Sequence, residues 1–504
     1  MGAAGDALVT ARDAVINFGL AGITRALSRG PGDDVAGRTD TPIQARSLSV
    51  TERVAIAKAA VLEWVLFDSR TARAAIAAVL SCVAFAAWIA RRHRTAIDLV
   101  MTLDRGAFPG PLPAMLRRAL SAEQPDDPTW IRRVRPRVLS RCREQTTGLQ
   151  PQPQTARFYA TPEALLGPLV MVLKPATAEE KGVLVLLYSY VLPLFGRLFD
   201  LERVVRRYHL VLEPSWSGYC NADVMCYRDV EDAVFVQAYE PRDREFIDSL
   251  GSNLVSIPTS NNWWVDHRVF APIAGVTRDI DVIMIAGWAP YKRHAPFFAA
   301  LRTLRRRGVR LRVALVGYSL GLSIDDLRRL AAHYGIDDQI EWHEGLSQPD
   351  VNLLLNRSKV NVIWSRKEGV NRAIVEGMFA GVPCVVRTGF NYGFRYPYIN
   401  EATGRFADET ELPDCLAWMV DNHHTFDPRP WVMEHMPCQR STDIVERAIR
   451  DRSHGPWSTS LAVKVNGLHG MHYWDENDAV RFAADYRFLR STIRQEPASH
   501  GVVA

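Results

Sequence analysis

The sequence predicts an α/β protein with two Rossmann-like domains and an N-terminal helical extension. Short apolar runs alternate with helical patterns from about residue 156 onward, which is typical of parallel, doubly wound sheets. A Pro/Gln-rich stretch at 144–155 separates this part from an arginine-rich first third. The 504 residues suffice for two or three domains. We expect these segments: 1–150, a helical and basic extension; 156–270, the first Rossmann-like domain; 271–450, the second; and 451–504, a C-terminal helical segment.

The extension contains an uncharged stretch, residues 74–90, between Arg73 and a basic cluster that starts at Arg91. Its 17 residues lie at the lower limit for a membrane span. The alternative is a buried helix in a water-exposed domain, and both readings stay open. If the stretch crosses a membrane, the basic cluster places the residues after it on the cytoplasmic side.

The amino-acid composition limits the classes of binding partner and the cellular compartment that we expect for this protein. Residues 91–143 carry many arginines, so they form either a solvated basic face or a surface for anionic lipid headgroups. We expect no nucleic-acid partner, because no helix-turn-helix or RNA-recognition motif is present and the net charge is only +5. The seven cysteines contain no CxxC pair, which indicates a reducing compartment without structural zinc. The expected location is the cytoplasm, with the cytoplasmic face of a membrane as the alternative.

The first Rossmann-like domain is expected from a series of apolar runs. Residues 181–187, 208–213, 233–237 and 254–258 read as its strands. Gly and Pro residues in the intervening segments mark the loops. At the other end of the chain, residues 473–490 read as one amphipathic helix.

The second domain opens with an arrangement suited to phosphate. The apolar run 282–286 predicts a buried strand, Gly287 breaks it, and the basic pair Lys292 and Arg293 precedes a helical pattern. Two cations there can neutralise a departing diphosphate. Upstream, Asp279 and Asp281 mimic a metal-binding Asp-x-Asp, but they stand at the start of the strand, so we expect no metal site.

Two further strands of this domain end at candidate ligand positions. One ends at Gly317, and the strand 360–364 delivers a loop that starts at Ser365. Ligands of doubly wound sheets bind at the carboxyl ends of the strands, so Gly287, Gly317 and residues 365–368 are expected to lie together.

The most informative motif spans residues 365–386. Glu368 and Glu376 stand eight positions apart, in a pattern of loop, helix, Gly-x-Pro turn and buried strand. Eight helical residues span at most about 12 Å, the scale of a nucleotide sugar. A diphosphate between the two carboxylates would meet the helix N-terminus, where free N–H groups favour anions.

This motif resembles the signature of the GT-B glycosyltransferases of family 4, the glycosyl transferases group 1. Their pattern is Glu, seven residues, Glu, and a turn with Gly-x-Pro. Asn371 and Arg372 depart from the Gly-Leu of many members. Lys292 resembles the family's lysine, whereas Gly287 stands where its arginine often lies, and we take Arg293 as the substitute.

The resemblance implies a GT-B fold, in which the two Rossmann-like domains face a cleft and the C-terminal helical segment, 451–504, packs back on the first domain. It further implies a retaining transferase that uses a nucleotide-diphosphate sugar and needs no metal or other cofactor. It also implies a glycan or lipid-linked acceptor bound by the first Rossmann-like domain, with a membrane surface as a further expected partner. The expected catalytic residues are Lys292, Arg293 and Glu368. The expected nucleotide-sugar-binding residues are Gly287, Gly317, Ser365, Gly369, Val370, Asn371 and Glu376.

Two other functions stay open on the sequence. The displaced arginine and the long extension favour a non-catalytic GT-B-like scaffold of a membrane polysaccharide-assembly complex. A sugar-nucleotide epimerase on the same fold is the other. In the first domain, Trp216 after the strand 208–213 either stacks on a sugar or packs between domains, and we favour packing.

Overall fold

A computed structural model describes most of the chain, and it divides into two compact units. Unit 1 comprises the described residues up to Ile76 together with His267–His435. Unit 2 comprises Ala77–Asp266 and the described residues from Met436 onward. The described residues are 54, 57–58, 61–147, 155–215, 218–220, 222–368, 371–453 and 455–494.

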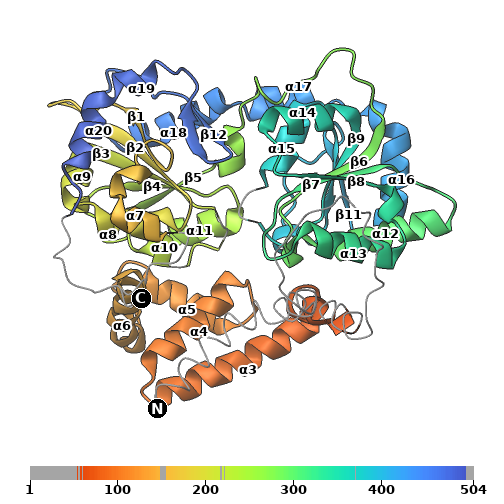
Figure 1. The fold of residues 1–504 in the computed structure, drawn as a ribbon. Helices are drawn as coiled ribbons and strands as arrows, with labels where there is room; N and C mark the ends of the chain where they lie inside the picture. The colour runs from red at the N-terminus through yellow and green to blue at the C-terminus, as the bar shows by residue number, and fades with distance from the viewer. Residues whose placement is uncertain are drawn as a thin grey trace. The chain divides into compact units, whose positions relative to one another are not determined.

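Unit 1 is built on a six-stranded sheet in the order β11-β10-β9-β6-β7-β8, and all its strand pairs are parallel (Figure 1). The central strands are almost fully buried, which explains their continuous apolar runs. The strands are β6 (Ile280–Ile285), β7 (Val313–Gly317), β8 (Ile340–Glu344), β9 (Ser358–Ile363), β10 (Cys384–Arg387) and β11 (Gly404–Ala407).

Helices cover both faces of this sheet. Figure 1 shows α14, α15 and α17 above it and α12 and α13 below it. The helices are α12 (His294–Arg306), α13 (Ile324–Tyr334), α14 (Gln348–Arg357), α15 (Arg372–Phe379), α16 (Leu412–Asn422) and α17 (Pro428–His435), with the short η1 (Trp64–Asp68), η4 (Pro290–Lys292), η5 (Asp337–Gln339), η6 (Phe390–Gly393) and η7 (His423–Thr425).

Unit 2 holds a five-stranded sheet in the order β1-β2-β3-β4-β5. Strands β2 to β5 are parallel, and β1 pairs antiparallel with β2. The four strands expected from the sequence are confirmed, whereas β1 and the hairpin β12–β13 were not predicted. The strands are β1 (Val170–Lys174), β2 (Gly182–Leu187), β3 (Tyr208–Glu213), β4 (Val234–Gln237), β5 (Leu254–Ile257), β12 (Lys464–Gly467) and β13 (Gly470–Tyr473).

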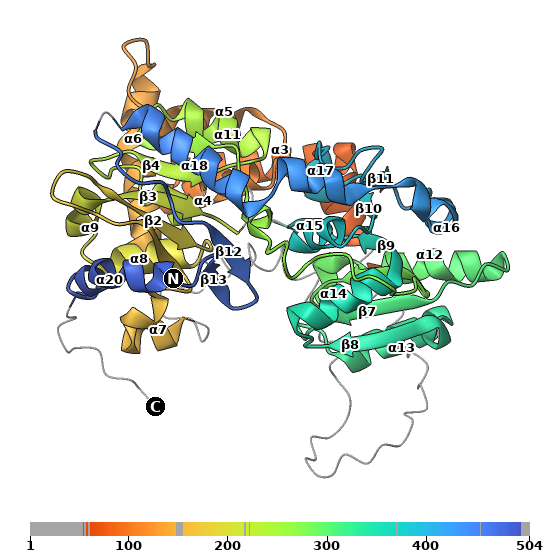
Figure 2. The same ribbon diagram turned by 90° about the horizontal axis from the view of Figure 1, so that it is seen from above.

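The helices of unit 2 include α4, α5 and α6, which precede its sheet in the chain. Ile97, Leu116 and Ile131 on these helices share one core with the strands. Figure 2 shows unit 2 from above. The helices are α4 (His93–Arg105), α5 (Pro111–Leu120), α6 (Thr129–Thr147), α7 (Ala156–Ala160), α8 (Val191–Leu198), α9 (Leu201–Arg207), α10 (Ala222–Met225), α11 (Pro241–Ser249), α18 (Cys438–Arg452), α19 (Asp478–Arg481) and α20 (Ala483–Arg490), with η2 (Pro162–Leu165) and η3 (Asn261–Trp264).

The C-terminal segment packs on the first strands of unit 2. The Tyr473 hydroxyl donates to the Val172 carbonyl at 2.7 Å, and the Tyr208 hydroxyl donates to the Asp485 carboxylate at 2.6 Å. The prediction of one helix over 473–490 was wrong, because Tyr473 belongs to β13 and the helical part breaks at Phe482, between α19 and α20. The strand β13 is only four residues long, so it leaves no apolar run long enough to be detected in the sequence.

The uncharged stretch 74–90 lies in α3 (Arg70–Ile89), a 20-residue helix. Among the described residues, α3 is the one helix long and apolar enough to cross a membrane, and only 17% of its most apolar window is buried. Within the part of the chain that the structure describes, α3 is therefore not covered as a buried core helix would be. Hydropathy alone could not distinguish a membrane span from a buried core helix, because the sequence of a helix is equally apolar whether or not other side chains cover it.

Candidate functional site

The loops at the carboxyl edge of the unit 1 sheet hold most of the site residues expected from the sequence. Gly287 follows β6, Gly317 ends β7, and Ser365 follows β9. Gly317 is required by close packing: a Cβ there would stand 2.5 Å from the Trp288 indole nitrogen and closer still to the Ala286 carbonyl oxygen. Parallel strands bring these three loops to one edge, as the topology predicts.

Glu368 is the centre of a buried polar cluster at this edge. Its Oε1 lies 2.8 Å from Lys292 Nζ and accepts hydrogen bonds from the Ser365 hydroxyl and, at 2.9 Å, from Asn371 Nδ2. The Glu368 backbone N–H donates to Asn391 Oδ1 at 2.8 Å. The structure thus brings together four predicted site residues from two separate segments, and Asn391 joins them from a third. A carboxylate held by a cation and two neutral donors is fixed in orientation.

Glu376 lies on the buried face of α15, two turns after Glu368. Its Oε1 pairs with Arg372 Nη2 at 3.0 Å, one turn earlier on the same helix. Burial raises the pKa of the Glu376 carboxyl, and Arg372 opposes that shift. Asn371 caps the helix, because its side-chain oxygen accepts from the Ile374 N–H at 3.1 Å. Gly369 and Val370, the other predicted loop residues, lie outside the described residues.

Arg293 does not point to the Glu368 cluster. Its backbone is left-handed (φ 62°), and its guanidinium pairs with Glu63 and Glu409. Its side chain is only 5% exposed, and burial together with Arg387 lowers its pKa to about 9. Geometry therefore separates Arg293 from Lys292, although the two are adjacent in sequence.

A charge cluster built on three buried arginines includes Arg293, and its other members were not predicted. Arg366 Nη2 lies 2.7 Å from Glu63, and Arg387 Nη2 lies 2.6 Å from Asp68. The five other members of the cluster come from four segments of the chain. Glu63 and Glu409 are 346 positions apart, so no local sequence pattern marks the cluster.

His294 is a second buried group that the sequence did not single out. It is the first residue of α12, and burial followed by the Lys292 charge lowers its pKa to about 3. Its Nδ1 is buried and has no hydrogen-bond partner among the described residues. The imidazole is therefore neutral at physiological pH.

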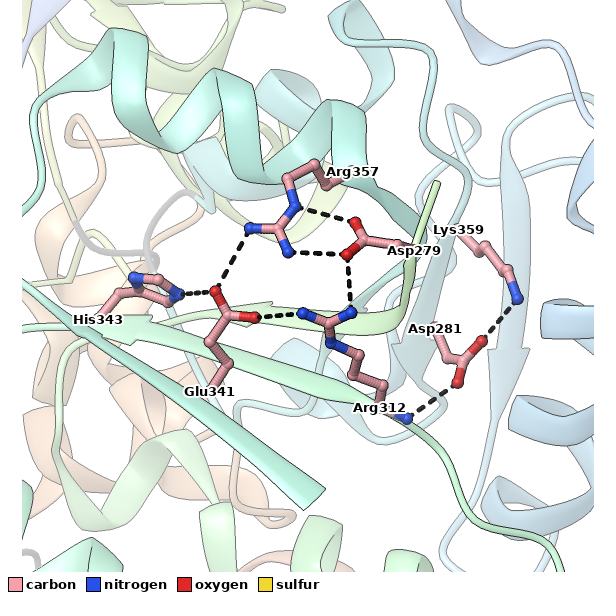
Figure 3. Close-up of polar contacts among 7 residues, drawn as sticks. All are labelled: Asp279, Asp281, Arg312, Glu341, His343, Arg357 and Lys359. Carbon is pink, nitrogen blue, oxygen red and sulfur yellow. Dashed lines mark hydrogen bonds and ion pairs between the residues drawn. The ribbon is translucent and has the colours of Figure 1, made fainter. Parts of the chain in front are cut away.

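The Asp279–Asp281 pair lies at the opposite, amino end of the strands, in a network of ion pairs (Figure 3). Asp279 accepts from Arg357 at 2.9 Å and Arg312 at 2.7 Å, and Asp281 pairs with Lys359 at 2.6 Å. Arg357 holds the pKa of Asp279 down at about 2. Both carboxylates thus serve cations of the protein, and no group of three metal-binding side chains occurs among the described residues.

In unit 2, Glu213 at the end of β3 is fully buried and fully engaged. Lys464 Nζ lies 2.8 Å from its Oε2, Asn466 Nδ2 donates to its Oε1 at 2.6 Å, and Gln237 Nε2 donates at 3.0 Å. This network ties the hairpin β12–β13 to the sheet, so its role is structural. Trp216 lies outside the described residues.

A cavity of about 510 Å³ adjoins the ion-pair network of unit 1, and a larger one of about 620 Å³ lies in unit 2. Tyr188, directly after β2, and Tyr190 line the larger cavity with their rings stacked 5.9 Å apart. Tyr188 has φ 72°, a conformation that bulky residues rarely adopt and that is often retained at functional sites. Arg157 and His469 supply polar groups to the same cavity.

Comparison with known proteins gives one family model, described as Glycosyl transferases group 1, which matches residues 270–422. A curated relative is GDP-mannose:cellobiosyl-diphosphopolyprenol alpha-mannosyltransferase of Xanthomonas oryzae pv. oryzae. It is 27% identical over 118 residues, which are 23% of this chain and 31% of the relative. This chain therefore aligns with less than a third of that relative's length.

Solved structures that resemble the chain include Anabaena HepE in complex with UDP and glucose. It is 13% identical, has a TM-score of 0.41, and the match covers 52% of this chain and 77% of HepE. Sucrose-phosphate synthase from Thermosynechococcus elongatus is 15% identical with a TM-score of 0.39, over 49% of this chain and 69% of the synthase. The two Rossmann-like units seen here are those expected of a GT-B fold, and over residues 270–422 this chain resembles the group 1 glycosyltransferases.

Proposed function

We propose that this chain is a retaining, metal-independent glycosyltransferase that moves a sugar from a nucleotide-diphosphate sugar to a lipid-linked or polysaccharide acceptor. The observation that carries the proposal is the cluster of Lys292, Ser365 and Asn371 around Glu368 at the carboxyl edge of the unit 1 sheet. Glu376 follows two helical turns later, buried on α15. A scaffold has no need of this arrangement of charges.

Each group of the cluster has a role in the proposed transfer. Glu376, when ionised, accepts hydrogen bonds from the two ribose hydroxyls. Glu368 holds a hydroxyl of the donor sugar. Lys292 stabilises the negative charge that grows on the leaving diphosphate, and an oxygen of that phosphate takes the acceptor's proton. Arg293 is tied to Glu63 and Glu409, so in this proposal it supports the loop that carries Lys292.

Unit 2 binds the acceptor in this proposed reaction. The curated relative's name gives it a diphosphopolyprenol-linked acceptor, which supports a lipid-linked acceptor here. The cavity lined by Tyr188 and Tyr190 suits a glycan, because aromatic faces pack against the C–H groups of a sugar ring. Arg157 in the same cavity can pair with a phosphate. We place the protein in the cytoplasm, at the cytoplasmic face of the membrane.

A thermal-shift panel with UDP, GDP, ADP and their sugars, run on the wild type and on Glu376→Ala, tests the donor assignment. A ligand that binds only the native state raises the melting temperature by mass action. We expect a shift with one nucleotide that Glu376→Ala abolishes. No shift with any of them at millimolar concentration would favour the non-catalytic scaffold.

Product analysis completes the test. A transferase consumes the donor only when an acceptor is present, whereas an epimerase converts the donor alone. The anomeric configuration of the product, read by NMR, decides between retention and inversion. Inversion would overturn the retaining assignment and leave the donor assignment intact.

A further inference from the structure

The exposed face of α3 is an uninterrupted apolar stripe. Every exposed position from 74 to 90 is Ala, Val, Cys, Phe or Ile. These positions recur at helical spacing, and Val79, Phe85 and Ile89 are 62%, 65% and 66% exposed. A single exposed apolar residue needs no explanation, but a stripe along a 20-residue helix, about 30 Å long, indicates an interaction surface.

Cationic and amphipathic residues flank the stripe. Arg70 is exposed at its start, and Arg91, Arg92 and Arg94 are exposed just after its end. Trp64, one turn before α3, is 56% exposed. Arginine side chains at the ends of an apolar helix face can reach anionic headgroups while the apolar residues enter the acyl region. This charge pattern fits an anionic lipid surface better than a second copy of the chain, whose own stripe would face the same arginines.

Ion pairs within unit 1 exclude a helix that crosses the bilayer. Glu63 and Asp68 precede α3 in the chain, whereas their partners Arg366 and Arg387 follow it. A single crossing would place the two sets on opposite sides of the membrane. Among the described residues no other helix can restore them to one side. The pairs are 2.7 and 2.6 Å long, so both ends of α3 lie on one side.

We infer that α3 lies in the plane of the bilayer interface, with its Val79–Phe85–Ile89 face in the acyl region and Arg91, Arg92 and Arg94 at anionic headgroups. The occupant of the exposed face is lipid. This inference deepens the membrane location included in the proposed function, and it is independent of the donor and acceptor assignments. It gives a mode of attachment in which a lipid-linked substrate and the enzyme share one surface.

Cys82, exposed on the stripe, is a built-in reporter. The full-length chain labelled there with a polarity-sensitive thiol dye is mixed with vesicles of phosphatidylcholine, with or without phosphatidylglycerol. The Cys82→Ser protein, treated identically, reports labelling at the remaining cysteines. We expect a blue shift and vesicle flotation that depend on the anionic lipid. Unchanged emission would overturn the inference; together with a concentration-dependent dimer it would assign the stripe to a second copy.

Depth measurements separate an in-plane helix from a crossing one. Ala75→Cys and Ile89→Cys, each made in the Cys82→Ser background, carry the same dye near the two ends of the stripe. Lipid-attached quenchers are placed at two depths. For an in-plane helix, each quencher should quench the labels at positions 75, 82 and 89 to the same extent. A label at Cys82 that is quenched most by the deep quencher, between two shallow end labels, would overturn the inference in favour of a span.

Charge substitutions test the stripe without touching the proposed donor site. Val79→Asp and Phe85→Asp should each lower vesicle binding at least tenfold. Val480→Asp, at a residue 79% exposed on α19, is the matched control and should bind as the wild type does. The nucleotide-induced thermal shift should be the same in all three, so that failed vesicle binding is distinct from failed donor binding. Unchanged vesicle binding in both stripe variants would contradict the inference.

Discussion

Glu63 and Arg366 are 303 positions apart in the chain, yet Glu63 Oε1 accepts from Arg366 Nε at 2.8 Å and lies 2.7 Å from its Nη2. The same carboxylate also pairs with Arg293. Burial lowers the pKa of Arg366 to about 10, and the side chains of the two arginines are only 9% and 5% exposed. One carboxylate before α3 thus compensates two buried cations beside the candidate site.

Removal of this carboxylate should destabilise unit 1. In Glu63→Ala, two buried guanidinium groups lose a shared partner, and breaking a buried pair typically costs about 3–5 kcal/mol. We expect about 2–4 kcal/mol less stability, since Glu63 itself is 14% exposed. Urea unfolding measures it. Glu123→Ala, which removes an exposed pair with Arg132, is the control and should change stability by less than about 1 kcal/mol. Equal losses would contradict the compensating role.

Lys292→Ala should act mainly on turnover. The Lys292 ammonium lies 2.8 Å from Glu368 and, in the proposed mechanism, meets charge that grows only in the transition state. We expect kcat to fall about 100- to 1,000-fold with a small change in donor affinity. Steady-state kinetics with the donor found by thermal shift measures both. Lys359→Ala, which removes the cation paired with Asp281 at the far edge of the sheet, should retain most of the turnover.

The pH dependence of donor binding should carry the signature of Glu376. Because burial raises the pKa of this carboxyl, it takes up a proton at a higher pH than an exposed glutamate does. Donor affinity should therefore fall as the pH is lowered through that raised pKa, since the neutral acid is a poorer acceptor for ribose hydroxyls. Titration calorimetry from about pH 8 to about pH 5 measures it.

In the unliganded protein, the raised pKa of Glu376 gives stability the opposite dependence on pH from donor affinity. A raised folded-state pKa contributes stability below the unfolded-state pKa, and that contribution is lost as the pH rises through the folded-state pKa. Glu376→Gln should remove both dependences. If the affinity of Glu376→Gln follows pH as the wild type does, another group is responsible.

Gly317→Ala should destabilise the site edge of the unit 1 sheet. The added methyl would stand 2.5 Å from the Trp288 indole nitrogen, and the sheet backbone beside it cannot move away cheaply. We expect a loss of about 1–3 kcal/mol in urea unfolding. Gly196→Ala, in α8, meets only Leu201 at 3.9 Å and should instead be neutral or stabilising by up to about 1 kcal/mol.

The tyrosine-lined cavity of unit 2 should matter for the acceptor alone. Tyr190 is 39% exposed, so Tyr190→Ala is expected to leave the fold intact. It should raise the acceptor KM by about 3- to 10-fold and leave the donor KM unchanged. Trp130→Ala, at a residue 42% exposed on α6 and outside the cavity, is the matched control. If Tyr190→Ala changed only the donor KM, the acceptor could not be assigned to this cavity.

The sequence by itself determined the features that depend on neighbours along the chain. The strand runs, the turn after α15, and the spacing of Glu368 and Glu376 are local, because helix and strand periods dictate them. The convergence of Gly287, Gly317 and Ser365 also followed, because parallel strands bring their carboxyl ends to one edge.

Only the tertiary structure decided the remaining features. It turned Arg293 away from Lys292 to Glu63, and it paired Asp279 with Arg312 and Arg357. It also left α3 exposed. The partner of a charge, and the presence or absence of a cover over an apolar helix, depend on residues hundreds of positions away, and no local period encodes them.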